Sequence, residues 1–421
     1  MSAPSRAQAL APFRVRSFRF QWPADLATSW AFEMETLILG WYVLVETQSV
    51  LMLTVFASLL YIGTLLAPMF GVMGDRIGHR NLLCAMRGLY ASLATILMSF
   101  ALLGMVTPAI VLAITAVMGL VRPSDIGMRA ALVAETMPPD RLVGAMSIQR
   151  TTQDSARIAG ALTGAGLVAL LGMGPAYAVV VTFYATSVLL TFKAGSSRPQ
   201  HDAARDASSE VPRSTPWRDL REGLAYVWNT PHLLGAMGFA FLLNLTAFPL
   251  FTGLLPYVAK EVYSSDQTTL GYMVAGASFG ALLGSMVLSR IGHAVRPARM
   301  GLIFGACWYA MLIVFAHTPH AAAGIAVLIV TGVVQSLGLI PMSAMLLRNS
   351  DVRFRGRVMG MRMLALYGNL PGLLISAPLI AHIGFPWTAT LYCAIGLAFT
   401  LVIAVRWRAH LWRRDAPANT R

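Results

Sequence analysis

The sequence predicts an all-α membrane protein with twelve transmembrane helices arranged as two pseudo-symmetric six-helix bundles. Of its 421 residues, 57% are hydrophobic and only 12% are charged, and the mean hydropathy is +0.65. A soluble domain carries roughly twice that charged fraction. The stretch Asp75–His79 returns as Ser289–His293 with one substitution, about half a chain length later. This repeat indicates that the chain consists of two related halves.

A membrane-spanning helix needs about 20 apolar residues, and on that measure the chain contains twelve spans. An even number of spans places both termini on the same side of the membrane. The expected spans are 22–45, 50–74, 82–104, 108–132, 147–171, 174–193, 232–257, 268–290, 298–316, 321–346, 357–382 and 385–406.

The net charge of +14 does not indicate a nucleic-acid-binding protein, because the basic residues form short clusters between apolar runs and lack a continuous basic face. Basic loops on one side of a bilayer explain them, and they place both termini in the cytoplasm, as in a bacterial inner-membrane protein. On the opposite side, Lys260 is the only basic residue expected. The arginines expected in cytoplasmic segments and at cytoplasmic helix ends include Arg6, Arg14, Arg16, Arg19, Arg76, Arg80, Arg87, Arg129, Arg141, Arg150, Arg157, Arg290, Arg296, Arg299, the cluster from Arg348 to Arg362 and the tail from Arg406.

Three segments follow from this pattern. Residues 1–193 form the N-terminal six-helix bundle, 194–231 a cytoplasmic linker, and 232–421 the C-terminal bundle with a basic tail. Within the linker, Trp217, Leu220, Leu224 and Trp228 recur at helical spacing. This spacing predicts an amphipathic helix on the membrane surface, or alternatively an ordinary connecting helix.

No cofactor or metal site is expected. Cys84, Cys307 and Cys393 lie far apart and suggest neither a disulfide framework nor metal ligands. The first apolar segment carries Glu33 and Glu35 and lacks a small-residue cleavage pattern, so no cleavable signal peptide is expected.

Five residues between the second and third spans, Gly71, Asp75, Arg76, Gly78 and Arg80, match the G-x-x-x-D-R-x-G-x-R loop motif of the major facilitator superfamily one by one. With the two halves and the basic central loop, the chain resembles that superfamily over nearly its whole length. The stretches Gly40–Val45, Glu135–Pro138, Asp140–Leu142 and Arg355–Gly360 resemble the branch that holds the enterobactin exporter and the macrolide efflux proteins. One departure is Ala161, which stands where many drug/proton antiporters carry proline.

The resemblance implies that the loop motif latches the two halves on the cytoplasmic side in one conformation. Arg355 and Arg357, which open the eleventh span, would be the partners across the seam, and Glu135 would join through Arg80. The alternative is a static turn that only sets topology, although topology alone would not require Asp75.

Glu33 and Glu35 are the most informative residues of the first span. If that helix starts near residue 22, Glu33 lies about 16 Å along it, close to the midplane of the bilayer. The two acids point to nearly opposite faces, and Ser29 and Thr36 share the face of Glu33. We therefore expect Glu33 to line a cavity and to bind a proton or cation. For Glu35 a structural hydrogen bond or ion pair is the favoured alternative.

Arg122 and Asp125 form the other polar pair at depth, beside Pro123 in the fourth span. Two arrangements are open: Arg122 neutralises Glu33 as part of the coupling site, or it pairs locally with Asp125. In the resembled superfamily, the first, fourth, seventh and tenth spans line the cavity. This would make Trp30, Asn244, Phe248 and Gln335 substrate contacts, although each also suits a packed position.

The leading functional hypothesis is a secondary active transporter that works by alternating access, with proton-coupled efflux of amphiphilic drugs or siderophore-like molecules. A lysophospholipid flippase or metabolite importer of the same fold is the alternative, and a non-transporting receptor is a third. An enzyme is not expected, because no nucleophile elbow is present. Neither Lys193 nor Lys260 follows a glycine, which excludes a phosphate-binding P-loop and argues against direct ATP drive. The resemblance implies a monomer in the lipid bilayer.

Overall fold

The computed structural model describes residues 11–195, 228, 230–291, 297–348 and 365–406. Within these ranges the regular secondary structure is helical, which confirms the predicted all-α fold class. The chain divides into two compact units. The N-unit comprises residues 1–39 and 62–215, and the C-unit comprises 40–61 and 216–421, so the division falls inside the first long helix.

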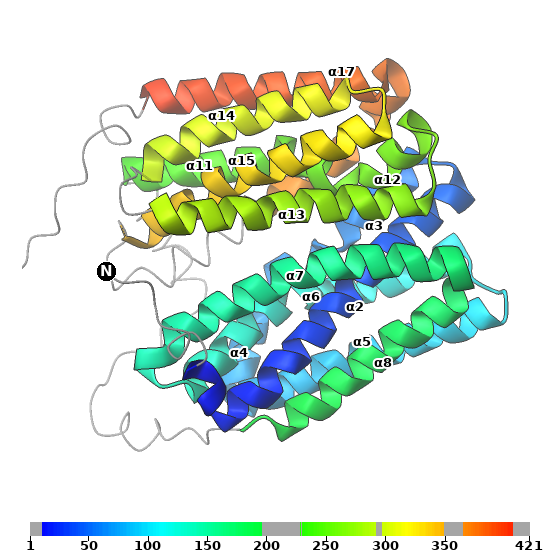
Figure 1. Cartoon of the computed structure of the whole chain (residues 1–421), viewed down its shortest axis with the longest axis vertical. Helices are drawn as coiled ribbons and strands as arrows, with labels where there is room; N and C mark the ends of the chain where they lie inside the picture. The colour runs from blue at the N-terminus through cyan, green and yellow to red at the C-terminus, as the bar shows by residue number, and fades with distance from the viewer. Residues whose placement is uncertain (1–10, 196–227, 229, 292–296, 349–364, 407–421) are drawn as a thin grey trace, which may run out of the picture. The chain divides into compact units, whose positions relative to one another are not determined.

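The N-unit contains most of α2 together with η1 and the helices from η2 to α8 (Figure 1). Their bounds are η1 Ala11–Arg14, α2 Arg16–Thr47, η2 Ile62–Leu66, α4 Ala67–Ile77, α5 His79–Leu102, α6 Pro108–Thr136, α7 Pro139–Leu171 and α8 Met173–Lys193.

The C-unit contains α3 and the helices of the second half of the chain (Figure 1). Their bounds are α3 Val50–Leu59, α11 Pro231–Thr246, η3 Pro249–Gly253, α12 Leu255–Tyr257, η4 Val258–Val262, α13 Gln267–Ile291, α14 Pro297–Ala316, α15 Ala321–Arg348, η5 Leu366–Gly368 and α17 Asn369–Arg406.

Nine helices of the described ranges are long and apolar enough to cross a membrane. The shorter apolar segment Val50–Leu66 and α4 together cover the expected span 50–74. The segment Leu366–Arg406 covers most of the last two expected spans, because α17 is broken at Gly384 (φ 79°, ψ 165°). Glycine adopts this left-handed φ at little cost, so the chain reverses there. These segments are compatible with the twelve-helix fold.

Three features expected from the sequence lie wholly or largely outside the described residues. They are the amphipathic helix around Trp217, Leu220 and Leu224, the arginines Arg355 and Arg357, and the basic tail beyond Arg406. Trp228, at the end of the expected amphipathic helix, is described as helical and exposed.

In the N-unit, α5 packs along α8, and α6 packs against both α5 and η2. The core between α2, α5 and α8 is aromatic. The ring of Phe32 lies 5.0 Å from the ring of Tyr90 and 5.7 Å from that of Tyr184, both edge to face. Edge-to-face contacts of this kind add about 0.5–1.5 kcal/mol beyond the area that the rings bury. They fix the position of α2 beside α5 and α8.

In the C-unit, α15 packs against both α13 and α14, and α17 packs against α11, α14 and α3 (Figure 1). The α13–α15 contact depends on small residues. A Cβ atom at Gly280 would lie 1.9 Å from the carbonyl oxygen of Ile329, and one at Gly332 would lie 2.1 Å from that of Ala277. The two backbones therefore touch directly, as is common between helices in a membrane.

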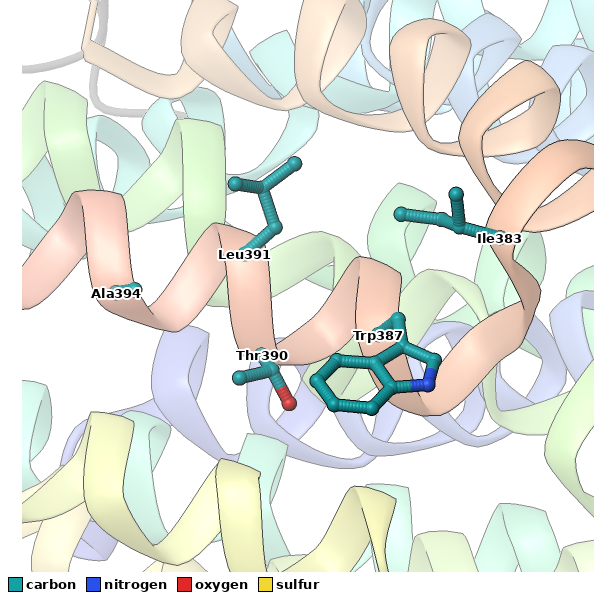
Figure 2. Close-up of a pocket in the computed structure, with 5 residues that line it drawn as sticks. All are labelled: Ile383, Trp387, Thr390, Leu391 and Ala394. Atoms are coloured by element: carbon teal, nitrogen blue, oxygen red, sulfur yellow. The ribbon is translucent and has the colours of Figure 1, made fainter.

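An apolar hollow of about 610 Å³ lies along α17 beyond Gly384. Figure 2 shows its lining residues, which are Ile383, Trp387, Thr390, Leu391 and Ala394. The hollow is open, and the side chain of Trp387 is 66% exposed. Exposed apolar side chains on a membrane helix are those expected to face lipid. None of the predicted site residues lines this hollow.

Candidate functional site

The polar residues Ser29, Glu33 and Thr36 of α2 are spaced three or four apart, so they lie on one face of the helix. Each of them contacts one arginine from α6 or α7. The three contacts are Arg129 Nη1 to Ser29 Oγ at 2.7 Å, Arg157 Nε to Glu33 Oε1 at 3.4 Å, and Arg122 Nη1 to Thr36 Oγ1 at 2.8 Å.

Glu33 is partly exposed and forms an ion pair with Arg157 of α7. The side chain of Glu33 is 22% exposed and that of Arg157 is 49% exposed. From the sequence, Arg122 was an expected partner of Glu33, and Arg157 was expected at the cytoplasmic side. The structure instead gives Glu33 a partner from α7. The reason is that α7 approaches α2 more closely than helical spacing alone could reveal.

Two glycines create this close approach. A Cβ atom at Gly160 would lie 2.7 Å from Glu33 Cβ and 3.0 Å from the carbonyl oxygen of Trp30, and one at Gly164 would lie 3.0 Å from Met34 Cα. Such distances leave no room for a side chain, so both glycines are needed for the close packing of α7 on α2. Arg157 lies one turn before Gly160, and this spacing places it beside Glu33.

Trp30, an expected cavity residue, lies at the same crossing. Its indole Nε1 donates a hydrogen bond to Thr163 Oγ1 at 2.8 Å, and its ring lies 5.3 Å from that of Phe183. The side chain is partly buried. Trp30 therefore packs between α7 and α8 and keeps some exposed surface.

Arg122 and Asp125 do not pair with each other. Asp125 forms its ion pair with Arg129, one turn further along α6. The guanidinium carbon of Arg122 lies 4.5 Å from the centre of the Phe32 ring, and Nη1 donates to Thr36. Neither arrangement that the sequence left open, with Glu33 or with Asp125, is present. The signal for Arg129 was its i,i+4 spacing from Asp125.

A buried charge network lies one to two turns before Glu33 along α2. Asp25 forms an ion pair with Arg87 of α5 and accepts a hydrogen bond from Gln149 Nε2 at 2.9 Å. Arg87 also donates to Thr191 of α8, and Arg129 donates to the main-chain oxygen of Asp25 at 3.2 Å. This network ties α2 to four other helices of the N-unit.

Arg87 and Arg129, which the sequence placed at cytoplasmic helix ends, are buried inside the N-unit. Their exposed fractions are 0% and 2%, and those of Asp25 and Asp125 are 2% and 0%. Two carboxylates and two guanidinium groups balance one another, as burial of charge requires. The available signal was Asp25 itself, because an acid inside the first span needs a basic partner.

Glu35 is in a different environment from Glu33, as the two-residue spacing predicted. It is 3% exposed and accepts hydrogen bonds from Tyr184 Oη at 2.8 Å and from Tyr177 Oη at 3.4 Å. Both tyrosines belong to α8. The carboxylate therefore lies inside the N-unit, in a pocket of hydroxyl donors.

The loop motif forms a tight junction between α4 and α5. Gly78 joins the helices with φ 88°, a conformation that favours glycine. A Cβ atom at Gly74 would lie 2.9 Å from the ring of His79, whereas one at Gly71 would meet nothing within 4 Å. A neighbouring side chain therefore packs closely against Gly74, whereas the space beside Gly71 is open. Asp75 lies in the last turn of α4, and its side chain is outside the described part of the structure.

The residues at the start of α5 link the motif to α6 and to the end of α8. His79 Nδ1 lies 2.5 Å from Glu135 Oε1, and Arg80 Nη1 donates to the carbonyl oxygen of Ala194 at 3.4 Å. The expected link from Glu135 ran through Arg80, whereas this contact runs through His79. Arg76 is exposed.

The C-unit contains a crossing that matches the one at Glu33. A Cβ atom at Gly368 would meet Phe241 O at 2.7 Å, Leu245 N at 3.0 Å and Asn244 Cβ at 3.2 Å. The corresponding neighbours of Gly160 are Trp30 O, Met34 N and Glu33 Cβ. Asn244 therefore occupies the position of Glu33 in the second half.

Asn244 is 6% exposed, and its Oδ1 accepts a hydrogen bond from Asn369 Nδ2 at 3.0 Å. An amide pair thus stands where the N-unit has an ion pair. Phe248 packs edge to face on the buried Trp308, with 5.1 Å between the ring centres. Gln335 lies on α15 and is partly buried. These three candidate substrate contacts remain predictions.

The bundles, their glycine crossings and the ionisable groups in the apolar helices define a multi-pass membrane protein. Residues 26–374 match the sequence model of the Major Facilitator Superfamily, and the chain belongs to this superfamily of membrane transporters. It is therefore a transporter of small molecules rather than an enzyme. Among curated proteins, no sequence matches this chain significantly.

Several solved transporters share the fold. The nucleoside transporter NupG is 14% identical, with 95% of this chain and 100% of that chain covered and a TM-score of 0.67. The human organic anion transporter MFSD10 is 15% identical over 93% and 99% of the two chains, with a TM-score of 0.65. The POT family transporter PepTSo is 11% identical over 95% and 99%, with a TM-score of 0.72. These likenesses support the fold and leave the enterobactin exporter and macrolide efflux branch as a prediction.

Proposed function

We propose that this protein is a proton-coupled secondary active exporter of amphiphilic small molecules, such as drugs or siderophore-like compounds. The observation that carries the proposal is the Glu33–Arg157 ion pair. The other described acids near this depth, Asp25, Glu35 and Asp125, are at most 3% exposed and have fixed partners inside the N-unit. Glu33 alone among these four combines a position deep in α2 with partial exposure.

A proton on Glu33 removes the charge that holds Arg157. Solvent weakens the attraction because both side chains are partly exposed, so a proton on Glu33 changes the contact with Arg157 without breaking the packing of α2 on α7. The glycine crossing beneath Glu33 holds the two helices close enough for this change to act on their packing. Ionisable residues inside a membrane segment are costly and commonly mark ion pathways. We include Arg122, which contacts Thr36 one turn from Glu33, and Asp125, which pairs with Arg129, in the same proposed coupling site, with Glu35 as its structural neighbour.

The two halves would alternate access to the substrate, with 1–193 and 232–421 as the moving bundles and 194–231 as the cytoplasmic linker. The motif from Gly71 to Arg80, with Glu135, Arg355 and Arg357, would latch the cytoplasmic side. We further propose a bacterial inner-membrane location, cytoplasmic termini and a monomer. The positive-inside distribution supports the orientation.

A lysophospholipid flippase or an importer of acidic metabolites is the second candidate. It is favoured by one specific observation, namely that Arg122 reaches the polar face of α2 without a carboxylate partner among the described residues. MFSD10, which shares the fold, is an organic anion transporter, and this likeness is consistent with an acidic substrate.

The experiment uses inside-out membrane vesicles that contain the wild-type protein. An imposed pH gradient, acid inside, is applied in the presence of a panel of lipophilic fluorescent dyes, cationic and anionic. The proposal predicts that at least one dye accumulates and that a protonophore abolishes the accumulation. Dye movement that ignores the gradient would contradict proton coupling. Loss of dye from the lumen under the gradient would favour the importer.

A further inference from the structure

Arg122 differs from the other three arginines that contact side chains of α2 in the described ranges. Arg87, Arg129 and Arg157 each form an ion pair, with Asp25, Asp125 and Glu33 in that order. In the described ranges Arg122 forms a hydrogen bond to Thr36 and a contact with the Phe32 ring, and no ion pair. It is the arginine of this group without a carboxylate partner.

An arginine in this setting requires an explanation. A guanidinium group removed from water costs several kcal/mol unless a counter-charge compensates it. Glu35 interacts with Arg122 electrostatically, but its two oxygens accept hydrogen bonds from Tyr184 and Tyr177. A charged residue inside a membrane helix commonly marks a functional site, and Arg122 has no carboxylate contact among the described residues to account for its charge.

The geometry of Arg122 suits an oxyanion. The group has five N–H donors in one plane, and the contact with Thr36 uses one of the terminal nitrogens. Phe32 holds the guanidinium over its ring at 4.5 Å, which restricts its orientation. The side chain is partly exposed, so the remaining donors are not all enclosed by the N-unit. A planar fork of this kind binds carboxylates and phosphates with two parallel hydrogen bonds.

We propose that Arg122 is the binding point for an oxyanionic group, such as a carboxylate, sulfonate or phosphate, on the transported amphiphile. The proposal rests on the transport function above, and it adds the charge of the substrate. Thr36, which holds Arg122, lies one turn from Glu33, so the anion site and the proton site adjoin on one face of α2. The anion can come from a soluble organic acid or from a lysophospholipid headgroup.

The test measures ligand binding to the purified full-length chain in nanodiscs. Three dansyl probes with one fluorophore are compared: dansylglycine is acidic, dansylamide is neutral, and a dansyl quaternary ammonium is cationic. A fluorescent lysophosphatidic acid represents the lipid source. The variants are Arg122→Gln, Arg122→Lys and the control Arg150→Gln. Arg150 pairs with Asp154 on α7, and its side chain is 69% exposed.

We expect wild type to bind an acidic probe most tightly. Arg122→Gln should weaken acidic binding about tenfold or more, because it removes a charge-assisted bidentate contact. Arg122→Lys should weaken it by several-fold, since the charge stays and the fork is lost. The neutral and cationic probes should change less than twofold, and Arg150→Gln should match wild type. Preference for dansylglycine would indicate an organic acid, and preference for the lysophospholipid would indicate a lipid.

Equal weakening of all probes in Arg122→Gln would overturn the proposal, and so would wild type that binds no acidic probe. The binding test of Arg122 and the test of proton coupling can fail independently of each other. If an imposed gradient drives no transport but Arg122→Gln loses acidic binding alone, the coupling proposal fails and the anion site stands. If the gradient drives transport of cations only, the anion site fails and coupling stands.

Discussion

Replacing Glu33 by glutamine should abolish gradient-driven accumulation of substrate while the protein stays folded. Glutamine has nearly the same shape as glutamate and can still accept a hydrogen bond from Arg157, so the α2–α7 crossing should persist. Glutamine cannot exchange a proton at neutral pH, so the pH gradient can no longer drive substrate accumulation. We expect accumulation in vesicles to fall at least tenfold, to the level seen with a protonophore. Downhill exchange of substrate should continue.

Glu35→Gln is the matched control for this result. Glu35 is buried and hydrogen-bonded to two tyrosines, so its replacement should change thermal stability more than coupling. Gradient-driven accumulation should remain within about threefold of wild type. A threefold change is well below the tenfold loss expected for Glu33→Gln, and tenfold corresponds to about 1.4 kcal/mol. The reverse pattern, with coupling lost in Glu35→Gln alone, would move the proton site to Glu35. Wild-type accumulation in both variants would make both carboxylates structural.

Arg87→Leu should be the most destabilising single substitution in the N-unit network. It leaves the carboxylate of Asp25 buried beside α5 without its main counter-charge, and breaking a buried pair in this way costs about 3–5 kcal/mol. The cost appears as a lower unfolding midpoint of the purified protein in detergent, measured by tryptophan fluorescence. Arg150→Leu is the control, because the side chain of Arg150 is 69% exposed and ion pairs of exposed side chains contribute about 0–1 kcal/mol.

The double variant Asp25→Asn, Arg87→Leu separates a pair from two independent losses. If the two residues form one buried pair, removing the second charge should recover part of the stability lost with the first. A double variant as unstable as the sum of the single variants would contradict the pairing. A midpoint for Arg87→Leu equal to that of Arg150→Leu would contradict the burial of Arg87.

The helical segments could be read from the sequence because they depend on local apolar content, and the α4–α5 turn because Gly78 marks it. The ion-pair partners of the buried and partly buried charges could not be read from the sequence. Arg157 reaches Glu33 only because Gly160 lets α7 touch α2, and the register of that crossing is a property of the assembled bundle. The sequence placed Arg87 and Arg129 near the ends of expected spans and could not name their buried partners, Asp25 and Asp125. α5 begins at His79 and α6 extends to Thr136, so both arginines lie well inside helices.

The relation between the halves was also only partly visible in sequence. The repeat around Asp75 and Ser289 indicated it, whereas nothing in the sequence aligned Glu33 with Asn244. These two residues occupy matching positions at matching glycine crossings, yet one is ionisable and the other is an amide. The predicted asymmetry, with charge in the first half and amides in the second, therefore has a structural counterpart at one pair of positions.

The measurement that tests the central claim most directly is proton flux in proteoliposomes. The purified protein is reconstituted with a pH-sensitive dye in the lumen, and a gradient of substrate is imposed without a pH gradient. The account predicts that downhill movement of substrate drives protons in the opposite direction in wild type and not in Glu33→Gln, while both proteins move substrate. Substrate movement without proton flux in wild type, or proton flux that survives in Glu33→Gln, would contradict it.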